Sequence, residues 1–143
     1  MMDVIEKFRG DYFFLSNFAP CRVTYEGETY PTVEHAFQAA KTLNPQERKI
    51  FRHVAEPAEA KKWGKTVTLR PNWESIKTEI MYELVKQKFN NPMYKKKLMA
   101  TGSSTLLEGN NHKDTFWGVY KGTGDNMLGK ILMRVRDELK GEV

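Results

Sequence analysis

The stretch YPTVEHAFQAAKTL at residues 30–43 alternates apolar and polar positions at helical spacing. Its apolar stripe consists of Val33, Ala36, Phe37 and Ala40, and its polar stripe consists of Glu34, Gln38 and Lys41. Thr32 precedes both stripes and is a suitable N-cap. The pattern predicts a helix that begins after Thr32 and ends at Asn44-Pro45.

Helical periodicity continues through most of the remaining chain. The further predicted helices cover about residues 45–54, 57–64, 72–89, 92–100 and 126–139. Prolines 45, 57 and 92 suit the first helical position, and Asn72 can cap the longest helix. The last helix carries a core stripe formed by Met127, Leu128, Ile131, Leu132, Val135 and Leu139.

Extended segments are few and short. The first thirty residues are predicted to be extended, and Glu26-Gly27 separates two runs rich in Val, Thr and Tyr, which predicts a hairpin. Residues 105–107 form a further extended piece. Because these pieces show no βαβ alternation, the predicted fold is α+β, mostly helical, with a small β region. No linker or repeat interrupts the pattern, so residues 1–143 are expected to form a single compact domain.

Composition supports a folded protein with an anionic partner. Apolar residues make up 40% of the chain and aromatic residues 12%, which is enough for a core. Lys and Arg outnumber Asp and Glu by 23 to 18, and a net charge of +5 suits an anionic ligand or nucleic acid. The densest basic run, YKKKL at residues 94–98, lies in a predicted helix, where a solvated face is the favoured explanation.

Cysteine and histidine usage predicts no metal site and no cofactor. Cys21 is the single cysteine, and His35, His53 and His112 show no ligand spacing. The N-terminal residues carry acids and lack a signal-peptide pattern, and no segment approaches the roughly 20 apolar residues that a membrane span requires. We therefore expect a cytoplasmic protein without a membrane partner.

Glu34 is the first candidate for chemistry. It falls in the first turn of its predicted helix, where the helix dipole and free backbone N–H groups favour the ionised carboxylate, and Lys41 acts in the same direction. Such a carboxylate suits water activation or stabilisation of a developing cation. The alternative is that Glu34, Gln38 and Lys41 form a solvated helix face.

Other candidates lie near the C-terminal third and at the start of the longest helix. Asp114 precedes Phe116-Trp117 and a glycine-rich loop, GVYKGTGDNMLG, which could hold a phosphate with its backbone N–H groups and the following helix N-terminus. The loop matches no established phosphate-binding pattern. Trp73 could stack on a base or anchor its helix in the core, and Arg9, Lys65 and Arg70 are candidate phosphate partners.

Several segments in register resemble the NADAR, or YbiA-like, N-glycosidase family. They are FLSNF at 14–18, YPTVEHAFQAAK at 30–41, LRPNWESIK at 69–77, KF at 88–89, LLEGNNHKDTFWG at 106–118 and NMLGKILMRVR at 126–136. The resemblance runs from about Phe8 to Leu139. Two positions depart from it: Lys65 replaces an Arg that is common after the third helix, and Val119 replaces an acid found in some relatives.

The resemblance implies a YbiA-like fold and hydrolysis of a bond between ribosyl C1′ and nitrogen. Its substrates would be ribosylamino-pyrimidine phosphates of riboflavin biosynthesis or ADP-ribose attached to guanine, and an ADP-ribosylated nucleic acid is a further partner. The implied catalytic residues are Glu34, Asp114 and Trp73. The predicted substrate-binding residues are Arg9, Asn17, Phe18, Gln38, Lys41, Arg70, Trp117, Gly118, Lys121 and Asn126.

These residues allow a metal-free mechanism. Cleavage proceeds through an oxocarbenium-like state that needs an anion near C1′ and a positioned water. Glu34 would activate the water or stabilise the cation, and Asp114 would orient the ribose hydroxyls or the leaving group. Trp73 would stack on the expelled base, which is worth about 1–3 kcal/mol. Two alternatives stay open: a module that binds ADP-ribose or a nucleotide without cleavage, and a basic nucleic-acid-binding domain.

Overall fold

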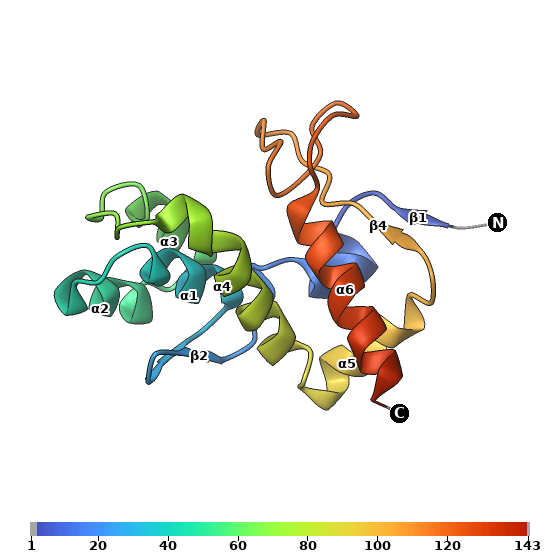
Figure 1. Cartoon of the computed structure of the whole chain (residues 1–143), viewed down its shortest axis with the longest axis horizontal. Coiled ribbons are helices and arrows are strands. Elements are labelled where there is room, and N and C mark those ends of the chain that lie inside the picture. The colour runs from blue at the N-terminus through green and yellow to red at the C-terminus, as the bar shows by residue number, and fades with distance from the viewer. Residues whose placement is uncertain (1–2, 143) are drawn as a thin grey trace. The chain divides into compact units, whose positions relative to one another are not determined.

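The computed structural model describes residues 3–142, whose internal contacts divide them into two compact units. The first unit consists of residues 17–88, and the second consists of residues 3–16 together with residues 89–142. Figure 1 labels the α-helices and the strands β1, β2 and β4. The first unit contains a β-hairpin and four α-helices, and the second contains two α-helices, a short 3-10 helix and two paired strands.

The hairpin of the first unit forms as the sequence predicts. Strands β2 (Val23–Tyr25) and β3 (Glu28–Tyr30) are antiparallel and pair Val23 with Tyr30. The connecting residues Glu26 and Gly27 both have positive φ, 46° and 86°, which is typical of the type I′ turn that suits a two-residue hairpin.

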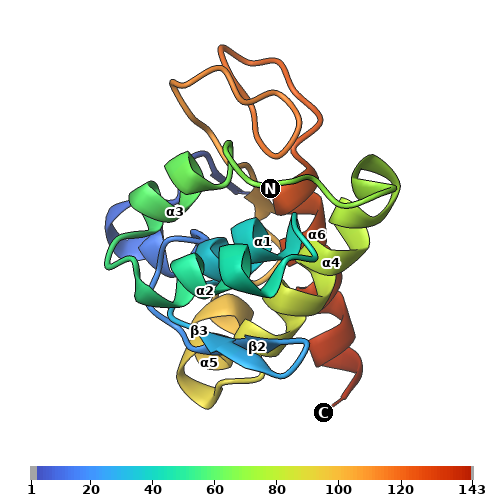
Figure 2. The ribbon, with the colours of Figure 1, turned by 90° about the vertical axis from the view of Figure 1, so that its left-hand side faces the viewer.

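Helix α1 (Val33–Ala40) lies at the centre of the first unit. It contacts α2 (Pro45–His53), α3 (Pro57–Trp63), α4 (Trp73–Lys88) and both hairpin strands, and the four helices appear together in Figure 2. All eight residues of α1 are buried, including Glu34, His35 and Gln38. The alternative of a solvated polar face is therefore wrong for Glu34 and Gln38.

Asparagine–proline pairs set the starts of two helices. The Asn44 side chain accepts hydrogen bonds from the backbone N–H groups of Gln46 and Glu47, and Pro45 opens α2. Asn91 caps α5 (Pro92–Ala100) in the same way. An Asn side chain satisfies free N–H groups of the first turn, and proline loses no hydrogen bond at the first helical position.

The second unit brings distant parts of the chain together. Strand β1 (Val4–Ile5) pairs in parallel with β4 (Thr105–Leu106), so that Ile5 lies opposite Leu106. Helix α6 (Met127–Gly141) contacts β4 and α5. Its buried residues are Leu128, Gly129, Ile131, Leu132, Val135, Arg136 and Leu139, which include most of the predicted stripe.

The structure confirms a mostly helical α+β fold and corrects the prediction for the first thirty residues. Residues 10–15 form a 3-10 helix, η1 (Gly10–Leu15), instead of an extended segment. The run YFFL within it has no apolar and polar alternation: Phe14 and Leu15 are both buried, whereas Tyr12 and Phe13 are exposed. Adjacent residues that share one side fit a helical turn and not a strand.

None of the helices within residues 3–142 combines the length and the apolar character that crossing a bilayer would require.

Candidate active site

Glu34 occupies the first turn of α1 and is only 8% exposed. Its backbone N–H donates to the carbonyl of Asn17 at 3.1 Å, which ties the segment before the hairpin to the helix N-terminus. The other N–H groups of this turn and the helix dipole favour a negative charge at this end of the helix. The predicted placement of the carboxylate at a helix start is confirmed.

Gln38 lies one turn after Glu34 and contacts it directly. The Gln38 side-chain nitrogen Nε2 donates to Glu34 Oε2 at 2.6 Å, a short hydrogen bond of the kind that an ionised acceptor makes. Gln38 is 5% exposed. Glu34 and Gln38, which were predicted as a catalytic and a substrate-binding residue, are thus hydrogen-bonded partners.

His35 fixes the N-terminus of α1 from the other side. Its Nε2 lies 3.0 Å from the carbonyl oxygen of Val54, which can only accept, so Nε2 carries the proton. Nδ1 then accepts from the Thr32 hydroxyl at 2.8 Å, while the same hydroxyl accepts from the His35 backbone N–H. Burial lowers the pKa of His35, although its bond to Val54 opposes this effect. The imidazole is therefore neutral at pH 7.

A pH-dependent stability follows from His35. A lowered pKa means that the unfolded chain takes up a proton at a higher pH than the folded chain does. We expect the free energy of unfolding to fall as the pH drops below about 6.5, the ordinary His value. In urea unfolding between pH 5 and 8, the free energy of unfolding should fall less steeply with decreasing pH in His35→Gln than in the parent. His53→Gln, a change at an exposed His on α2, should retain the parent slope.

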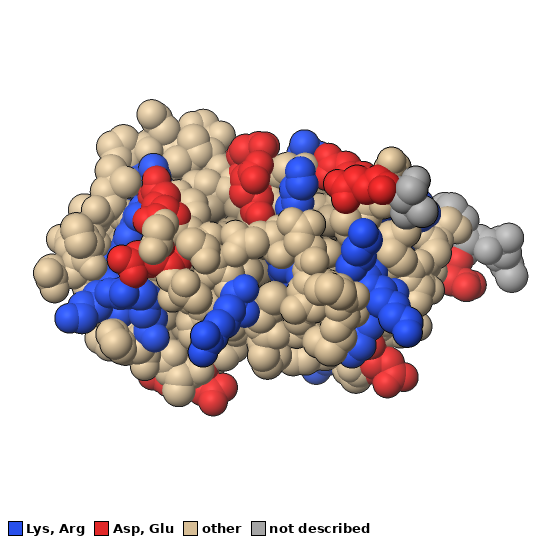
Figure 3. Space-filling model, turned by 90° about the horizontal axis from the view of Figure 1, so that it is seen from below, with Lys and Arg blue, Asp and Glu red and all other residues tan. Residues whose placement is uncertain are grey.

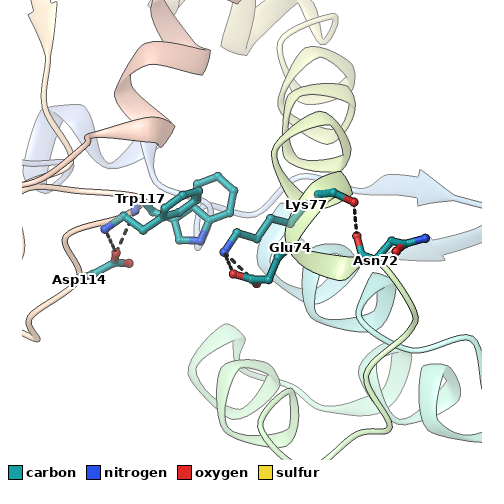
Figure 4. A network of polar contacts seen from close by, with 7 residues as sticks. Asn72, Glu74, Lys77, Asp114 and Trp117 are labelled. Atoms are coloured by element: carbon teal, nitrogen blue, oxygen red, sulfur yellow. Dashed lines mark hydrogen bonds and ion pairs between the residues drawn. The ribbon is translucent and has the colours of Figure 1, made fainter.

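Lys41 follows α1 as its C-cap and is half-buried. Burial lowers its pKa, whereas the charge of Glu34 raises it, and Lys77, Lys61 and Lys65 lower it further. Coulombic effects of this kind require proximity, so Lys41 lies within electrostatic range of Glu34 and of these three lysines. Of the three, Lys77 also binds both carboxylate oxygens of Glu74 at 2.8 and 3.0 Å (Figure 4).

Arg70 is held against the end of α1. Its backbone N–H donates to the carbonyl of Lys41 at 2.7 Å. Its guanidinium Nη1 donates to the Tyr25 hydroxyl at 3.0 Å and to the carbonyl of Ala40 at 3.3 Å. The predicted residues Lys41 and Arg70 therefore lie side by side.

Trp73 is the first residue of α4 and is 5% exposed. Its ring lies 5.1 Å from the ring of Phe37 on α1, at an interplanar angle of 51°. This contact anchors the start of α4 on the helix that carries Glu34. Of the remaining predictions in this unit, Asn17 also donates to Met81 Sδ at 3.4 Å, and Phe18 is half-buried.

Asp114 lies in the other unit and closes a tight turn. Its Oδ1 accepts from the backbone N–H groups of Phe116 at 3.0 Å and Trp117 at 2.9 Å (Figure 4). Asn110 brackets the same turn, because its amide accepts from the Asp114 N–H and donates to the Asp114 carbonyl. Phe116 and Trp117 meet edge to face at 4.8 Å. Asp114 thus has a turn-forming role, and its second carboxylate oxygen has no hydrogen-bond partner among residues 3–142.

The glycine-rich loop is packed against its own unit. A Cβ on Gly118 would overlap Glu108 and would lie 2.7 Å from the Asn110 amide, so close backbone contact requires glycine there. Asn126 accepts from the Glu108 N–H at 2.9 Å and donates to the Leu106 carbonyl at 2.8 Å. Both ends of its amide are thereby engaged.

Two predicted cations of this unit are exposed. Lys121 has its ammonium 5.4 Å from the Tyr120 ring centre, and Arg9 precedes η1.

Sequence reasoning missed three contributors to these arrangements. They are Gly64, at the end of the predicted helix 57–64, Lys61 within that helix, and Asn110 within the segment LLEGNNHKDTFWG. The position of Lys61 within the helix 57–64 gave a weak signal, because it places Lys61 near the end where Lys65 follows. Nothing local marks Gly64, since its contact is with Gln38 on another helix, whereas Asn110 lies only four residues before Asp114 in the same turn.

The charge on one face of the surface is mixed, and the described residues hold no metal-ligand cluster. On the face drawn in Figure 3, Lys and Arg are interspersed with Asp, Glu and uncharged residues, so the described residues present no continuous basic surface there. Within the described part of the chain, His, Cys, Asp and Glu form no group of three or more that could hold a metal ion.

Known proteins resemble this chain over nearly its whole length. N-glycosidase YbiA of Escherichia coli is 37% identical over 97% of this chain and 91% of its own length. N-glycosidase Npun_R5314 of Nostoc punctiforme is 37% identical over 90% of this chain and 86% of its own. The maize chloroplastic riboflavin biosynthesis protein PYRR is 38% identical over 90% of this chain, which corresponds to 23% of PYRR.

The fold of this chain is also similar to that of a solved relative. The NMR structure of Escherichia coli YbiA superimposes with a TM-score of 0.84 at 36% identity, covering 99% of this chain and 88% of that one. The NADAR domain model matches residues 6–140. The chain is therefore a member of the NADAR family.

Proposed function

We propose that this chain is an N-glycosidase that hydrolyses the bond between ribosyl C1′ and nitrogen in a phosphorylated substrate. The observation that carries the proposal is the buried Glu34 carboxylate, placed at a helix N-terminus within electrostatic range of Lys41. Relatives that match the chain from end to end are named N-glycosidases, which supports the same reaction class.

Glu34 suits the demands of this reaction. As the C1′–N bond breaks, the ribosyl ring acquires positive charge, and a water oxygen forms the new bond to C1′. An ionised carboxylate can stabilise that charge or remove the proton of the water, while the departing nitrogen takes up a proton. The hydrogen bond from Gln38 and the N-terminal location in α1 both favour the ionised form.

Lys41 and the lysines near it would provide affinity for the phosphate. Lys61 and Lys65 lie within electrostatic range of Lys41, and their repulsion of Lys41 would be relieved when an anion binds. Arg70 adds a guanidinium at the end of α1. We expect these groups to act mainly on KM and not on kcat, because the phosphate stays unchanged during cleavage.

We infer that Asp114 is the second acid of the reaction. Its Oδ1 is committed to the turn at Phe116-Trp117, which fixes the orientation of the carboxylate and leaves Oδ2 for a ribose hydroxyl or the leaving group. We further propose that Trp73 and Trp117 contact the base, and that Arg9, Asn17, Phe18, Gly118, Lys121 and Asn126 complete the substrate contacts.

The preferred substrate class is a ribosylamino-pyrimidine phosphate of riboflavin biosynthesis. Maize PYRR, a relative, is named a riboflavin biosynthesis protein, as is a Vibrio vulnificus protein that is 39% identical over 89% of this chain. The chain spans 23% and 35% of these two proteins, so the shared region is one part of each. ADP-ribose attached to guanine is the second candidate substrate.

The test compares both substrates directly. We expect the purified chain to release base and sugar phosphate from a ribosylamino-uracil phosphate, detected by mass spectrometry, at a rate at least about 10-fold above that for guanosine-linked ADP-ribose. The reverse ratio would select the ADP-ribosyl class. Tight binding of ADP-ribose without cleavage of either compound would overturn the proposal in favour of a binding module.

A further inference from the structure

Gly64 has an ordinary backbone conformation, so backbone strain does not explain why position 64 is a glycine. It is the C-cap of α3 with φ −60° and ψ −19°, which any L-residue adopts without strain. Alanine at such a position normally increases stability, because it restricts the unfolded chain. The surroundings of Gly64 offer another explanation.

The group in question is the side chain of Gln38. A Cβ on Gly64 would overlap the amide oxygen Oε1 of Gln38 and would lie 2.7 Å from its Cδ and 3.3 Å from its Cβ. Alanine at position 64 would therefore require the Gln38 amide to move from its present place. The missing side chain of Gly64 makes room for this amide.

The opposite end of the same amide binds Glu34. Gln38 Nε2 donates to Glu34 Oε2 at 2.6 Å, whereas Gln38 Oε1 is buried and has no hydrogen-bond partner within residues 3–142. A flipped amide would place Oε1 against the carboxylate, where two acceptors repel, so the ionised Glu34 selects the observed orientation. A buried acceptor without a partner costs stability, which means that stability alone does not favour this arrangement.

We infer that Gln38 and Gly64 are positioning residues for Glu34, with the Gln38 amide held between the α3 terminus and the carboxylate. The inference rests on the proposed function insofar as Glu34 is the reacting carboxylate. In this inference Gln38 holds the Glu34 carboxylate in position and does not contact the substrate directly. Gly64 acts one step further away, because it acts only through Gln38.

A double-mutant cycle tests this chain of contacts. Gly64→Ala and Gln38→Ala should each lower kcat by about 10–100-fold with little change in KM, because a small displacement of the carboxylate slows the reaction without weakening phosphate binding. In the double variant the overlap is gone, so its kcat should equal that of Gln38→Ala. If the two losses multiply, Gly64 does not act through Gln38 and the inference fails.

A second readout does not depend on activity. The Glu34 side-chain carboxyl carbon, followed by 13C NMR during a pH titration, should titrate at a higher pH in Gly64→Ala and Gln38→Ala than in the parent, because the carboxylate loses a donor. Unchanged midpoints would overturn the inference. If the parent cleaves no N-glycoside, the proposed function fails, and the titration still decides whether Gln38 and Gly64 hold the carboxylate.

Folding controls complete the design. Gly141→Ala changes a glycine in α6 whose Cβ would meet nothing within 4 Å, so it should leave kcat and the titration unchanged. If Gly64→Ala fails to fold, the double variant decides the matter. Recovery of folding in Gly64→Ala/Gln38→Ala would support the overlap, and its continued failure to fold would contradict it.

Discussion

Replacing Glu34 with Gln is expected to lower kcat for N-glycoside hydrolysis by about 1,000-fold. Gln has nearly the shape of Glu, but it carries no charge to stabilise an oxocarbenium-like state and no basic oxygen to activate water. Its amide oxygen can still accept from Gln38 Nε2, so the local hydrogen bond survives. The loss should be measured as kcat at saturating substrate, with urea unfolding to show that the fold persists.

Glu59→Gln is the matched control for this change. Glu59 is also an acid in the first turn of a helix, α3, but it is exposed. Its replacement should leave kcat within about 2-fold of the parent, since exposed groups away from the site contribute little. A Glu34→Gln variant that retains a tenth or more of the parent kcat would rule out Glu34 as the reacting carboxylate.

Replacing Asn126 with Ala is expected to lower the free energy of unfolding by about 3 kcal/mol. The change removes the Asn126 side-chain partner of the half-buried Glu108 N–H and of the buried Leu106 carbonyl. It also places Ala at φ 51°, a left-handed conformation that Asn tolerates better. Urea unfolding measures the loss, and the same variant shows how much of any KM change reflects lost folding.

Asn72→Ala separates the cost of the left-handed backbone from the cost of the lost hydrogen bonds. Asn72 also has a left-handed conformation, φ 63°, directly before a helix, but it is exposed. We expect Asn72→Ala to lower the free energy of unfolding by about 1 kcal/mol, because only the left-handed backbone contributes there. Equal losses in both variants would show that the two hydrogen bonds of the Asn126 amide add nothing to stability, and would leave the proposed substrate contact as the role of that amide.

Local signals were sufficient to predict most helices. Asn-Pro pairs at 44–45 and 91–92 combine a cap with a residue suited to the first turn, and both helices begin there. The Glu26-Gly27 turn likewise identified the hairpin, because positive φ at both positions favours residues of this kind. In each case the deciding contacts join residues within a few positions of one another.

Features that depend on contacts between residues far apart in the sequence could not be predicted from local patterns. The pairing of Val4–Ile5 with Thr105–Leu106 involves two residues in each strand, too few for a periodic pattern. Lys88 is a similar case: it is only 1% exposed, and burial lowers its pKa to about 7, although lysine is among the residues most often exposed. The sequence KF around it carries no sign of this burial.

In the candidate site, too, features set by local contacts could be predicted, and features set by distant contacts could not. The location of Glu34 in a first helical turn could be predicted, because it depends on Thr32 and the next few residues. The engagement of Gln38 by both Glu34 and Gly64 could not, because it requires the packing of α3 on α1. Spacing alone shows that two side chains share a helix face, and it does not show whether they bind each other or a ligand.

The parallel β1–β4 pair has a consequence for synthesis on the ribosome. Residues 17–88 form one continuous compact unit, so all the partners within that unit are present once the segment has emerged. Ile5 must wait for Leu106, about a hundred residues later, which takes roughly 5–20 s at ordinary elongation rates. During that interval the nascent chain carries an unpaired N-terminal strand, so the order of folding is set by connectivity: the inserted unit first and the discontinuous unit last.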